Sequence, residues 1–311
     1  MGVTVERWHA HSEAVNKIYL DTARLLTHAA PVVFQSGVFA LKGGTAINLF
    51  IRDMPRLSID LDLVFADHAV PREAALEQIS RAVNAASGEL RKRGFNVQVR
   101  TVDDVETKLD ARRDNIAIKV EANTVIRGTV NAPGVRSLTP RAQDILQANI
   151  EIPVASVEDV YGGKLVAALD RQHPRDLFDV MQLYEYDGIT PAIRRAFVIY
   201  LSSHPRPVHE VLSPKLRDIS LDYEGAFKGM TAEAVELDQL LAVRDRLVGD
   251  IQKSLDANER RFLISLVNAA PEWELLGVPH AHELPALRWK LMHIEQLAKK
   301  NPKSLLPKLL N

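Results

Sequence analysis

Two aspartates separated by one residue, Asp60 and Asp62, have a spacing suited to binding a metal ion. Over residues 58–63 polar and apolar residues alternate strictly, which predicts a strand that carries both aspartates on its polar face. Carboxylates placed in this way project together and repel each other unless a cation lies between them. Mg²⁺ prefers oxygen ligands and often joins such carboxylates to substrate phosphates. The pair therefore predicts a metal site for phosphoryl or nucleotidyl transfer.

A glycine turn precedes this strand. A short strand is predicted at 39–41, and Gly43 and Gly44 then permit close approach of the backbone to a ligand. We expect Thr45 to cap the helix that follows, and the N–H groups at its start to bind a triphosphate. Gly-Gly-Thr is more often a structural turn, and Asp-x-Asp is commonly a solvated strand face. Their joint order, strand, turn, helix and acidic strand, describes a nucleotidyltransferase core.

Arg56 and Ser58 complete a pattern that is specific enough to compare with a family. The sequence reads Lys-Gly-Gly-Thr-Ala at 42–46 and Arg-x-Ser-x-Asp-Leu-Asp at 56–62, and a second motif with lysine, arginine and aspartate follows at 164–179. These segments resemble the AbiEii/AbiGii (MenT-like) nucleotidyltransferase toxins of bacterial toxin–antitoxin and phage-defence systems. We expect Arg56 to pair with an acid of the strand or with a phosphate, and Ser58 to contact the phosphate or the metal.

The resemblance covers roughly residues 38–186 and implies both a fold and an activity. The implied fold is α/β, with the mixed sheet of the polymerase beta-like nucleotidyltransferases followed by a helical C-terminal domain. The implied substrates are a nucleoside triphosphate and the acceptor end of tRNA, with translation blocked as a result. A toxin also implies a cognate antitoxin protein as partner.

The second motif contains a lysine in an unusual place. Lys164 lies within the apolar stripe of a helix predicted at 157–171, where an unpaired charge is costly to bury. The resemblance makes it the lysine that contacts the nucleotide, although a lysine at a domain edge can also extend its ammonium to water. Arg171 shares its face and is expected to assist with phosphate. The resemblance also makes Asp176 a required acid, which we expect to orient Lys164 or the acceptor hydroxyl. Alternatively it complements a helix dipole, and Asp179, one turn later, is expected to be structural.

A third carboxylate is expected on a neighbouring strand. Glu121 lies on the polar face of a strand predicted at 115–125 and is our prediction for a base or a third metal ligand. Asp110 and Asp114 are its rivals, but we expect them in a solvated, charged turn. The predicted metal is Mg²⁺, with Mn²⁺ as the alternative.

The elements that must position these residues divide the chain into two halves. Strands are predicted at 39–41, 58–63, 95–102, 115–125 and 146–154, with helices at 11–30, 45–50 and 71–93. Further helices are predicted at 157–171, 174–186, 190–202, 232–255, 257–268 and 283–300. We therefore expect a nucleotidyltransferase core with an N-terminal helix at 1–155, and a helical domain at 156–311 that contributes Lys164 and Asp176 to the cleft.

The composition excludes several classes of protein. The 311 residues carry a formal charge of −1 and no cysteine, which excludes disulfides, cysteine-ligated metals and thiol catalysis. We find no signal peptide and no membrane-spanning stretch, so we expect a cytoplasmic protein with no membrane partner. P-loop, Rossmann and serine-hydrolase motifs are not found at a strand–helix junction.

The C-terminal stretch from residue 285 is basic. Its cations are Arg288, Lys290, Lys299, Lys300, Lys303 and Lys308. They form either a solvated helix face or a surface for an RNA backbone. Three other activities stay open: modification of a protein, modification of an antibiotic-like small molecule, or a catalytically silent nucleotide-binding module that acts through partner contacts.

Overall fold

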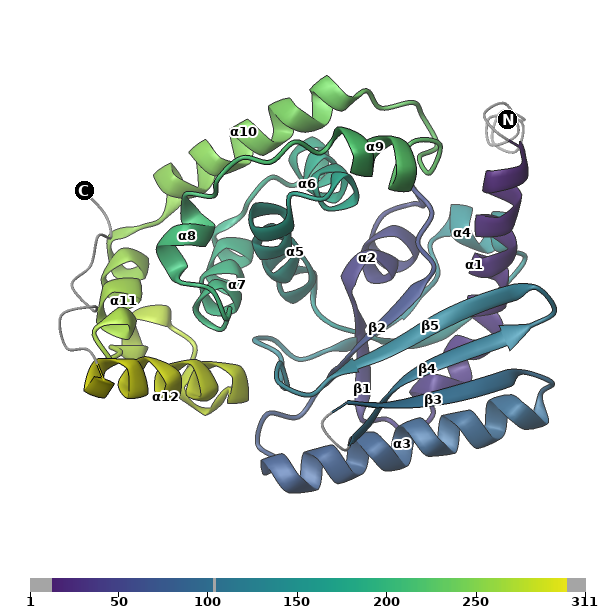
Figure 1. Cartoon of the computed structure of the whole chain (residues 1–311), viewed down its shortest axis with the longest axis horizontal. Helices are drawn as coiled ribbons and strands as arrows, with labels where there is room; N and C mark the ends of the chain where they lie inside the picture. Colours follow the sequence, from purple (N-terminus) through teal and green to yellow (C-terminus); the bar gives the residue numbers. More distant parts are fainter. Residues whose placement is uncertain (1–12, 103–104, 301–311) are drawn as a thin grey trace. The chain divides into compact units, whose positions relative to one another are not determined.

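The computed structural model describes residues 13–102 and 105–300 and divides the chain into two compact units (Figure 1). Residues 1–156 with 227–235 form one unit, and residues 157–226 with 236–311 form the other. The segment 227–235 lies in the predicted second half but belongs to the first unit. Its backbone pairs with the chain before the acidic strand, because Leu57 N donates to Met230 O over 2.9 Å and Ala232 N donates to Pro55 O over 3.0 Å.

The first unit, the sheet unit, is built on a seven-stranded mixed sheet in the order β3-β4-β5-β2-β1-β7-β6. The strands are β1 (Phe39–Lys42), β2 (Asp60–Phe65), β3 (Asn96–Val102), β4 (Val105–Arg113), β5 (Ile116–Asn123), β6 (Gly134–Ser137) and β7 (Glu151–Val154). The acidic strand β2 runs antiparallel to β1 and parallel to β5. The mixed α/β sheet confirms the predicted fold class.

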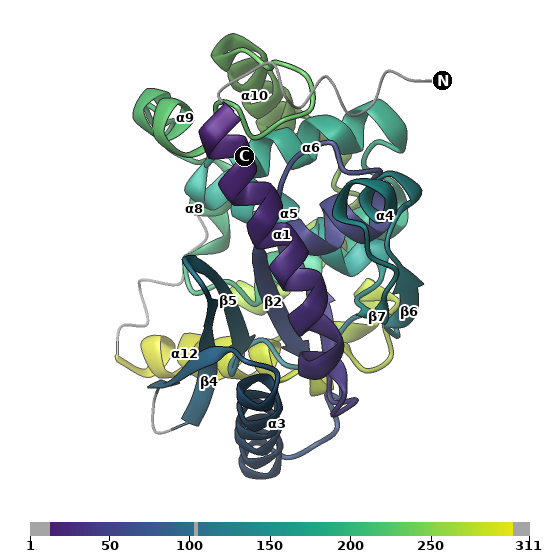
Figure 2. The same ribbon diagram turned by 90° about the vertical axis from the view of Figure 1, so that its right-hand side faces the viewer.

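One face of this sheet is covered by two helices, α1 (Glu13–Phe34) and α3 (Arg72–Lys92). Helix α1 contacts β5 and β7, α3 contacts β3 and β4, and the helices contact each other (Figure 2). The covered face presents apolar register partners from successive strands, Leu109, Val120 and Leu61, which are all buried. Strand alternation therefore turns the charged residues between them to the opposite face.

Shorter helical segments join the strands of this unit. They are α2 (Gly43–Thr45), the π-helix η2 (Ala46–Ile51) and α4 (Pro140–Leu146). Together α2 and η2 occupy the region where we expected one helix at 45–50, so that helix begins two residues earlier, at the first glycine of the turn.

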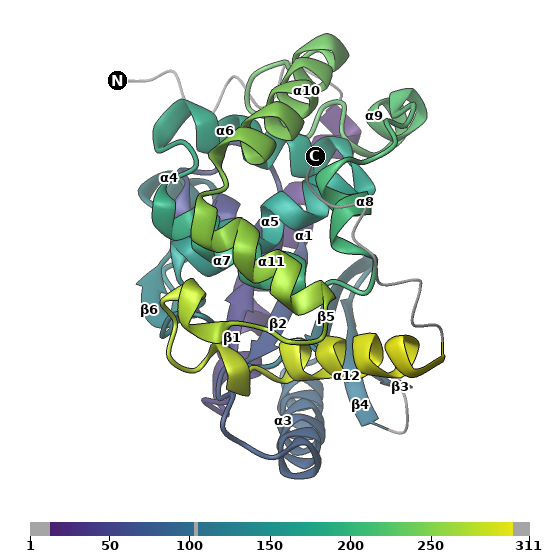
Figure 3. The ribbon, with the colours of Figure 1, turned by 90° about the vertical axis from the view of Figure 1, so that its left-hand side faces the viewer.

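The second unit, the helical unit, is arranged around α5 (Val157–Arg171), which contacts four neighbouring helices (Figure 3). These are α6 (Pro174–Tyr186), α7 (Pro191–Ser202), α8 (Val208–Leu212) and α10 (Leu237–Ser254). The unit also contains α9 (Ser220–Ala226), α11 (Ala257–Val267), η3 (Trp273–Leu276), η4 (Ala281–Glu283) and α12 (Pro285–Lys300). Helices α5 and α7 approach closely at Gly162, where a Cβ would lie 2.8 Å from the backbone of α7.

The predicted charged turn around residue 110 is wrong. Asp110 lies inside strand β4, its side chain is 13 % exposed, and it forms an ion pair with Arg100 of β3. In this strand Thr107, Leu109 and Ala111 are buried and alternate with charged residues, which is a strand pattern that the high charge obscured. Of the two rival aspartates, Asp114 alone lies in the turn between β4 and β5.

Candidate active site

The three predicted carboxylates of the sheet unit share one face of the sheet. Asp60 and Asp62 lie on β2, opposite the face that α1 and α3 cover. On the parallel strand β5, Glu121 is the register partner of Asp62, and Lys119 is the register partner of Asp60. Register partners on neighbouring strands have Cα atoms about 5 Å apart and project to the same side. The fold thus places Glu121 directly beside Asp62.

Asp62 belongs to a row of charged register partners that crosses five strands. The row reads Arg100, Lys108, Glu121, Asp62 and Lys42, from β3 to β1, and we call it the charged row. Lys108 Nζ lies 2.6 Å from Glu121 Oε1, with the two side chains 39 % and 55 % exposed. Burial lowers the pKa of Lys42, while the charges of Asp62 and Glu121 act to raise it. Cations from both sides therefore face the two carboxylates.

The glycine turn packs directly against the acidic strand. Gly43 has a φ of 75°, and a Cβ there would overlap with Asp62 Oδ2. A Cβ at Gly44 would lie 2.6 Å from Arg56 Nη2 and 3.0 Å from Ser58 Oγ. Only glycines permit this approach, so the turn forms a cradle in which the Asp62 carboxylate meets bare backbone.

Thr45 does not cap a helix, contrary to our expectation. It is the last residue of α2 and stands at the N-cap position of η2, but its side chain makes no capping hydrogen bond. Its hydroxyl donates to the Asp60 carbonyl over 2.5 Å and lies 3.0 Å from Ser58 Oγ. The cap prediction fails because the helix begins at Gly43, so the threonine is free to bind the neighbouring strand.

Arg56, Ser58 and Thr45 are all buried, at 2 %, 9 % and 1 % exposure. Arg56 Nη1 donates to the Leu57 carbonyl over 2.9 Å. The three side chains join the turn to the acidic strand, and their contact with a nucleotide stays a prediction.

The donor chemistry of this face fits a hard divalent cation. Asp60, Asp62 and Glu121 supply only carboxylate oxygens, which Mg²⁺ prefers, and the turn at Gly43 brings bare backbone against Asp62. Within residues 13–102 and 105–300, no three Asp, Glu or His side chains are gathered closely enough to hold one ion. Two of the predicted ligands, Asp62 and Glu121, are nevertheless direct neighbours.

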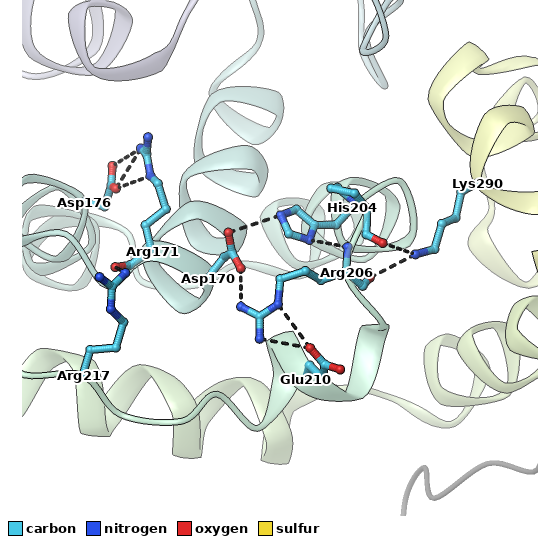
Figure 4. A network of polar contacts seen from close by, with 9 residues as sticks. Asp170, Arg171, Asp176, His204, Arg206, Glu210, Arg217 and Lys290 are labelled. Carbon is cyan, nitrogen blue, oxygen red and sulfur yellow. Dashed lines mark hydrogen bonds and ion pairs between the residues drawn. The ribbon is translucent and has the colours of Figure 1, made fainter. Parts of the chain in front are cut away.

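Lys164 of the helical unit is buried between two aspartates of α6. Its Nζ lies 2.7 Å from Asp176 Oδ1 and 2.9 Å from Asp179 Oδ2, and the three side chains are 6 %, 4 % and 0 % exposed. Arg171 adds two hydrogen bonds of 3.0 Å to Asp176 (Figure 4). Burial acts to raise the pKa of Asp176, but Lys164 and Arg171 outweigh it, so the pKa lies below its ordinary value. The partner that a buried lysine requires is thus supplied by the protein.

Comparison with known proteins identifies the family. Residues 24–292 match the family model described as nucleotidyl transferase AbiEii toxin of a type IV toxin–antitoxin system. The chain belongs to the AbiEii toxin family. It is therefore a nucleotidyltransferase, and its family implies a nucleoside triphosphate as substrate and an antitoxin as partner.

Among solved structures, this AbiEii-family chain is similar to MenT4, a nucleotidyltransferase toxin from Mycobacterium tuberculosis H37Rv. The TM-score is 0.59 at 19 % identity, covering 94 % of this chain and 99 % of that one. At this identity the likeness shows the fold alone. Among curated protein sequences, none matches. The described part of the chain has no helix both long and apolar enough to cross a membrane.

Three residues that shape these two regions were given no structural role from the sequence. Asn48 Nδ2 donates to the Gly44 carbonyl over 2.9 Å, and its only signal was a lone amide in an apolar run. Lys42 is half-buried beside Asp62. His173 is the N-cap of α6, because its Nδ1 accepts a hydrogen bond of 3.1 Å from Arg175 N. The His-Pro pair before the predicted helix was its signal.

The basic C-terminal stretch of this AbiEii-family toxin does not form one solvated face. Lys290 is 8 % exposed, and its ammonium donates to the carbonyls of Pro205 and Arg206 over 3.0 Å each (Figure 4). Arg288 and Lys299 are exposed. The side chain of Lys300 and the whole of residues Lys303 and Lys308 lie outside the described part of the chain.

Proposed function

We propose that this AbiEii-family enzyme transfers a nucleoside monophosphate from a nucleoside triphosphate to the 3′ end of tRNA, in a Mg²⁺-dependent reaction that inhibits translation and growth. The observation that carries the chemistry is the placement of Asp60, Asp62 and Glu121 on one face, beside a glycine turn with no room for a side chain. The choice of tRNA as acceptor rests on what the resemblance to this family implies.

The reaction assigns a separate role to each part of the sheet unit. The 3′ oxygen of the acceptor attacks the α-phosphorus, the bond from this phosphorus to the bridging oxygen breaks, and pyrophosphate leaves. Asp60 and Asp62 would hold Mg²⁺, which when bound neutralises charge on the attacking and leaving oxygens. Glu121 would be a third ligand or accept the hydroxyl proton. Backbone N–H groups at Gly43 and Gly44 would hold the triphosphate.

The predicted roles of the second motif concern the same reaction. Nucleotide contact by Lys164 and Arg171 and the requirement for Asp176 stay predictions. Lys164 and Arg171 both donate hydrogen bonds to Asp176. Loss of this aspartate would therefore disturb both of the cations that are predicted to contact the nucleotide.

The proposal is tested by incubating total tRNA with each α-labelled nucleoside triphosphate and Mg²⁺. We expect label in tRNA, none with EDTA, and none with tRNA whose 3′ end has been oxidised with periodate. Asp60→Ala and Asp62→Ala should lower transfer by about a thousandfold or more, because they remove the metal's ligands. Asp114→Asn, in the exposed turn between β4 and β5, is the matched control and should retain transfer.

The alternative activities predict other outcomes. Label in protein, or in a low-molecular-weight fraction, would identify that material as the acceptor and reject the tRNA proposal. Absence of label from every fraction, together with undiminished growth inhibition by Asp60→Ala in cells, would indicate a nucleotide-binding module without catalysis.

A further inference from the structure

The charged row contains more cations than a simple metal site needs. Lys108 on β4 and Lys42 on β1 flank Glu121 and Asp62 in register, so that lysines stand at both ends of the carboxylate pair. Lys108 is bound to Glu121 over 2.6 Å. A divalent cation that uses Glu121 must therefore compete with an ammonium group already in contact with it.

The ion pair between Lys108 and Glu121 differs from a buried structural pair in its exposure. The side chains of Lys108 and Glu121 are 39 % and 55 % exposed, and ion pairs in such positions contribute little to stability. The pair can therefore open at small cost. An ammonium released from a neutralised carboxylate remains next to the metal, where the phosphates of a nucleotide are the acceptors available to it.

We propose that Lys108 is an exchangeable counter-ion of Glu121: a divalent cation displaces its ammonium group, which then binds the triphosphate. This inference rests on the proposed metal-dependent function and extends it to the order of binding. Metal alone binds weakly, because it must displace Lys108 and is repelled by it. Metal and nucleotide together bind tightly, since the displaced ammonium group gains a new partner. The sheet unit thereby couples the affinity for metal to the presence of nucleotide.

The structure supplies a matched control on the same face. Arg100 forms an ion pair with Asp110, and its side chain is 57 % exposed. Asp110 is the register partner of Lys119, whereas Glu121 is that of Asp62. Arg100 lies three strands from Asp62, about 15 Å at the usual strand spacing, which exceeds the screening length at physiological salt. Arg100→Met removes a cation–carboxylate pair of the same sheet face without touching Glu121 or Asp62.

The test measures binding of Mn²⁺ alone and binding of nucleotide at saturating Mn²⁺. The nucleotide is the tightest binder among the four α,β-methylene nucleoside triphosphates. Lys108→Met should bind Mn²⁺ about threefold to tenfold more tightly, because a repelling charge is lost, and should bind nucleotide about threefold to tenfold more weakly, because a phosphate partner is lost. Lys108→Gln, which retains polarity, should show the same two signs, and Arg100→Met should change neither.

Opposite changes in the two affinities separate exchange from a structural role, which would weaken both. If Lys108→Met and Lys108→Gln weaken Mn²⁺ binding or leave it unchanged, the inference is overturned. Asp62→Asn separates this failure from that of the proposed function, because Asp62 is a ligand of the proposed metal site. Weaker Mn²⁺ binding by Asp62→Asn keeps the metal site while the lysine exchange is rejected, and unchanged Mn²⁺ binding by Asp62→Asn rejects both.

Discussion

Two lysines of this protein face carboxylates in opposite surroundings. Lys164 in the helical unit is 6 % exposed between two aspartates that are 4 % and 0 % exposed. Lys108 in the sheet unit is 39 % exposed, against a glutamate that is 55 % exposed. Removing one partner of a buried ion pair costs about 3–5 kcal/mol, whereas an exposed pair is worth about 0.2–1 kcal/mol. Burial thus fixes the first lysine, and exposure leaves the second free to change partners.

The largest expected effect is a loss of stability in the buried cluster of Lys164, Asp176 and Asp179. Lys164→Met should lower the free energy of unfolding by about 3–5 kcal/mol, because Asp179 would remain buried without this cation and Asp176 would keep only Arg171. Urea unfolding at pH 7 measures this loss, and Lys108→Met should change stability by less than about 1 kcal/mol.

A second substitution identifies the source of that loss. Adding Asp179→Asn to Lys164→Met removes one of the uncompensated charges and should restore part of the stability. If Lys164→Met is as stable as Lys108→Met, the contrast between the two regions is rejected.

The same two regions show what the sequence could predict. Helical phase placed Lys164 on a packed face, since its neighbours one turn away are apolar, and burial confirms that placement. The pairing of Lys108 with Glu121 escaped prediction because it depends on β4, whose charged residues resemble a solvated turn. Cross-strand register is a tertiary property, so alternation could place Glu121 on a polar face but could not identify its neighbours. The predicted cap at Thr45 failed for a local reason, as the helix starts two residues earlier.

An intermediate effect is expected at the glycine turn of the sheet unit. Gly43→Ala should weaken Mn²⁺ binding about tenfold or more and destabilise the protein by about 1–3 kcal/mol, because φ is 75° and the added Cβ would displace the Asp62 carboxylate. Isothermal titration and urea unfolding measure the two effects.

Gly163 of α5 is the control for this substitution. A Cβ there meets nothing within 4 Å, so Gly163→Ala should leave Mn²⁺ binding unchanged and stabilise the helix by up to about 1 kcal/mol. Equal Mn²⁺ affinities for Gly43→Ala and the unmodified protein would remove the turn from the metal site.

The smallest expected effect concerns pH and acts on the helical unit alone, since the charged row contains no histidine. Burial and the charge of Arg175 lower the pKa of His173, and its neutral Nδ1 accepts the hydrogen bond that caps α6 three residues before Asp176. The unfolded chain then binds this proton more readily than the folded protein. Its contribution is therefore complete above the unfolded pKa of about 6.5 and is lost as the pH falls through the lowered value.

The measurement is the change in the free energy of unfolding between pH 8 and pH 5. The pKa of His204 is also lowered, chiefly by burial, so this histidine adds a pH dependence of the same sign and variants are needed to separate the two. His173→Asn keeps a capping side chain without a titrating group, so its loss of stability over this range should be smaller than that of the unmodified protein by up to about 1 kcal/mol, the usual value of a helix cap. His204→Asn should retain the part due to His173. Equal slopes for His173→Asn and the unmodified protein would mean that the cap does not couple to protonation. The lowered pKa of Asp176 would still make the folded protein lose stability in acid, below a pH of about 4.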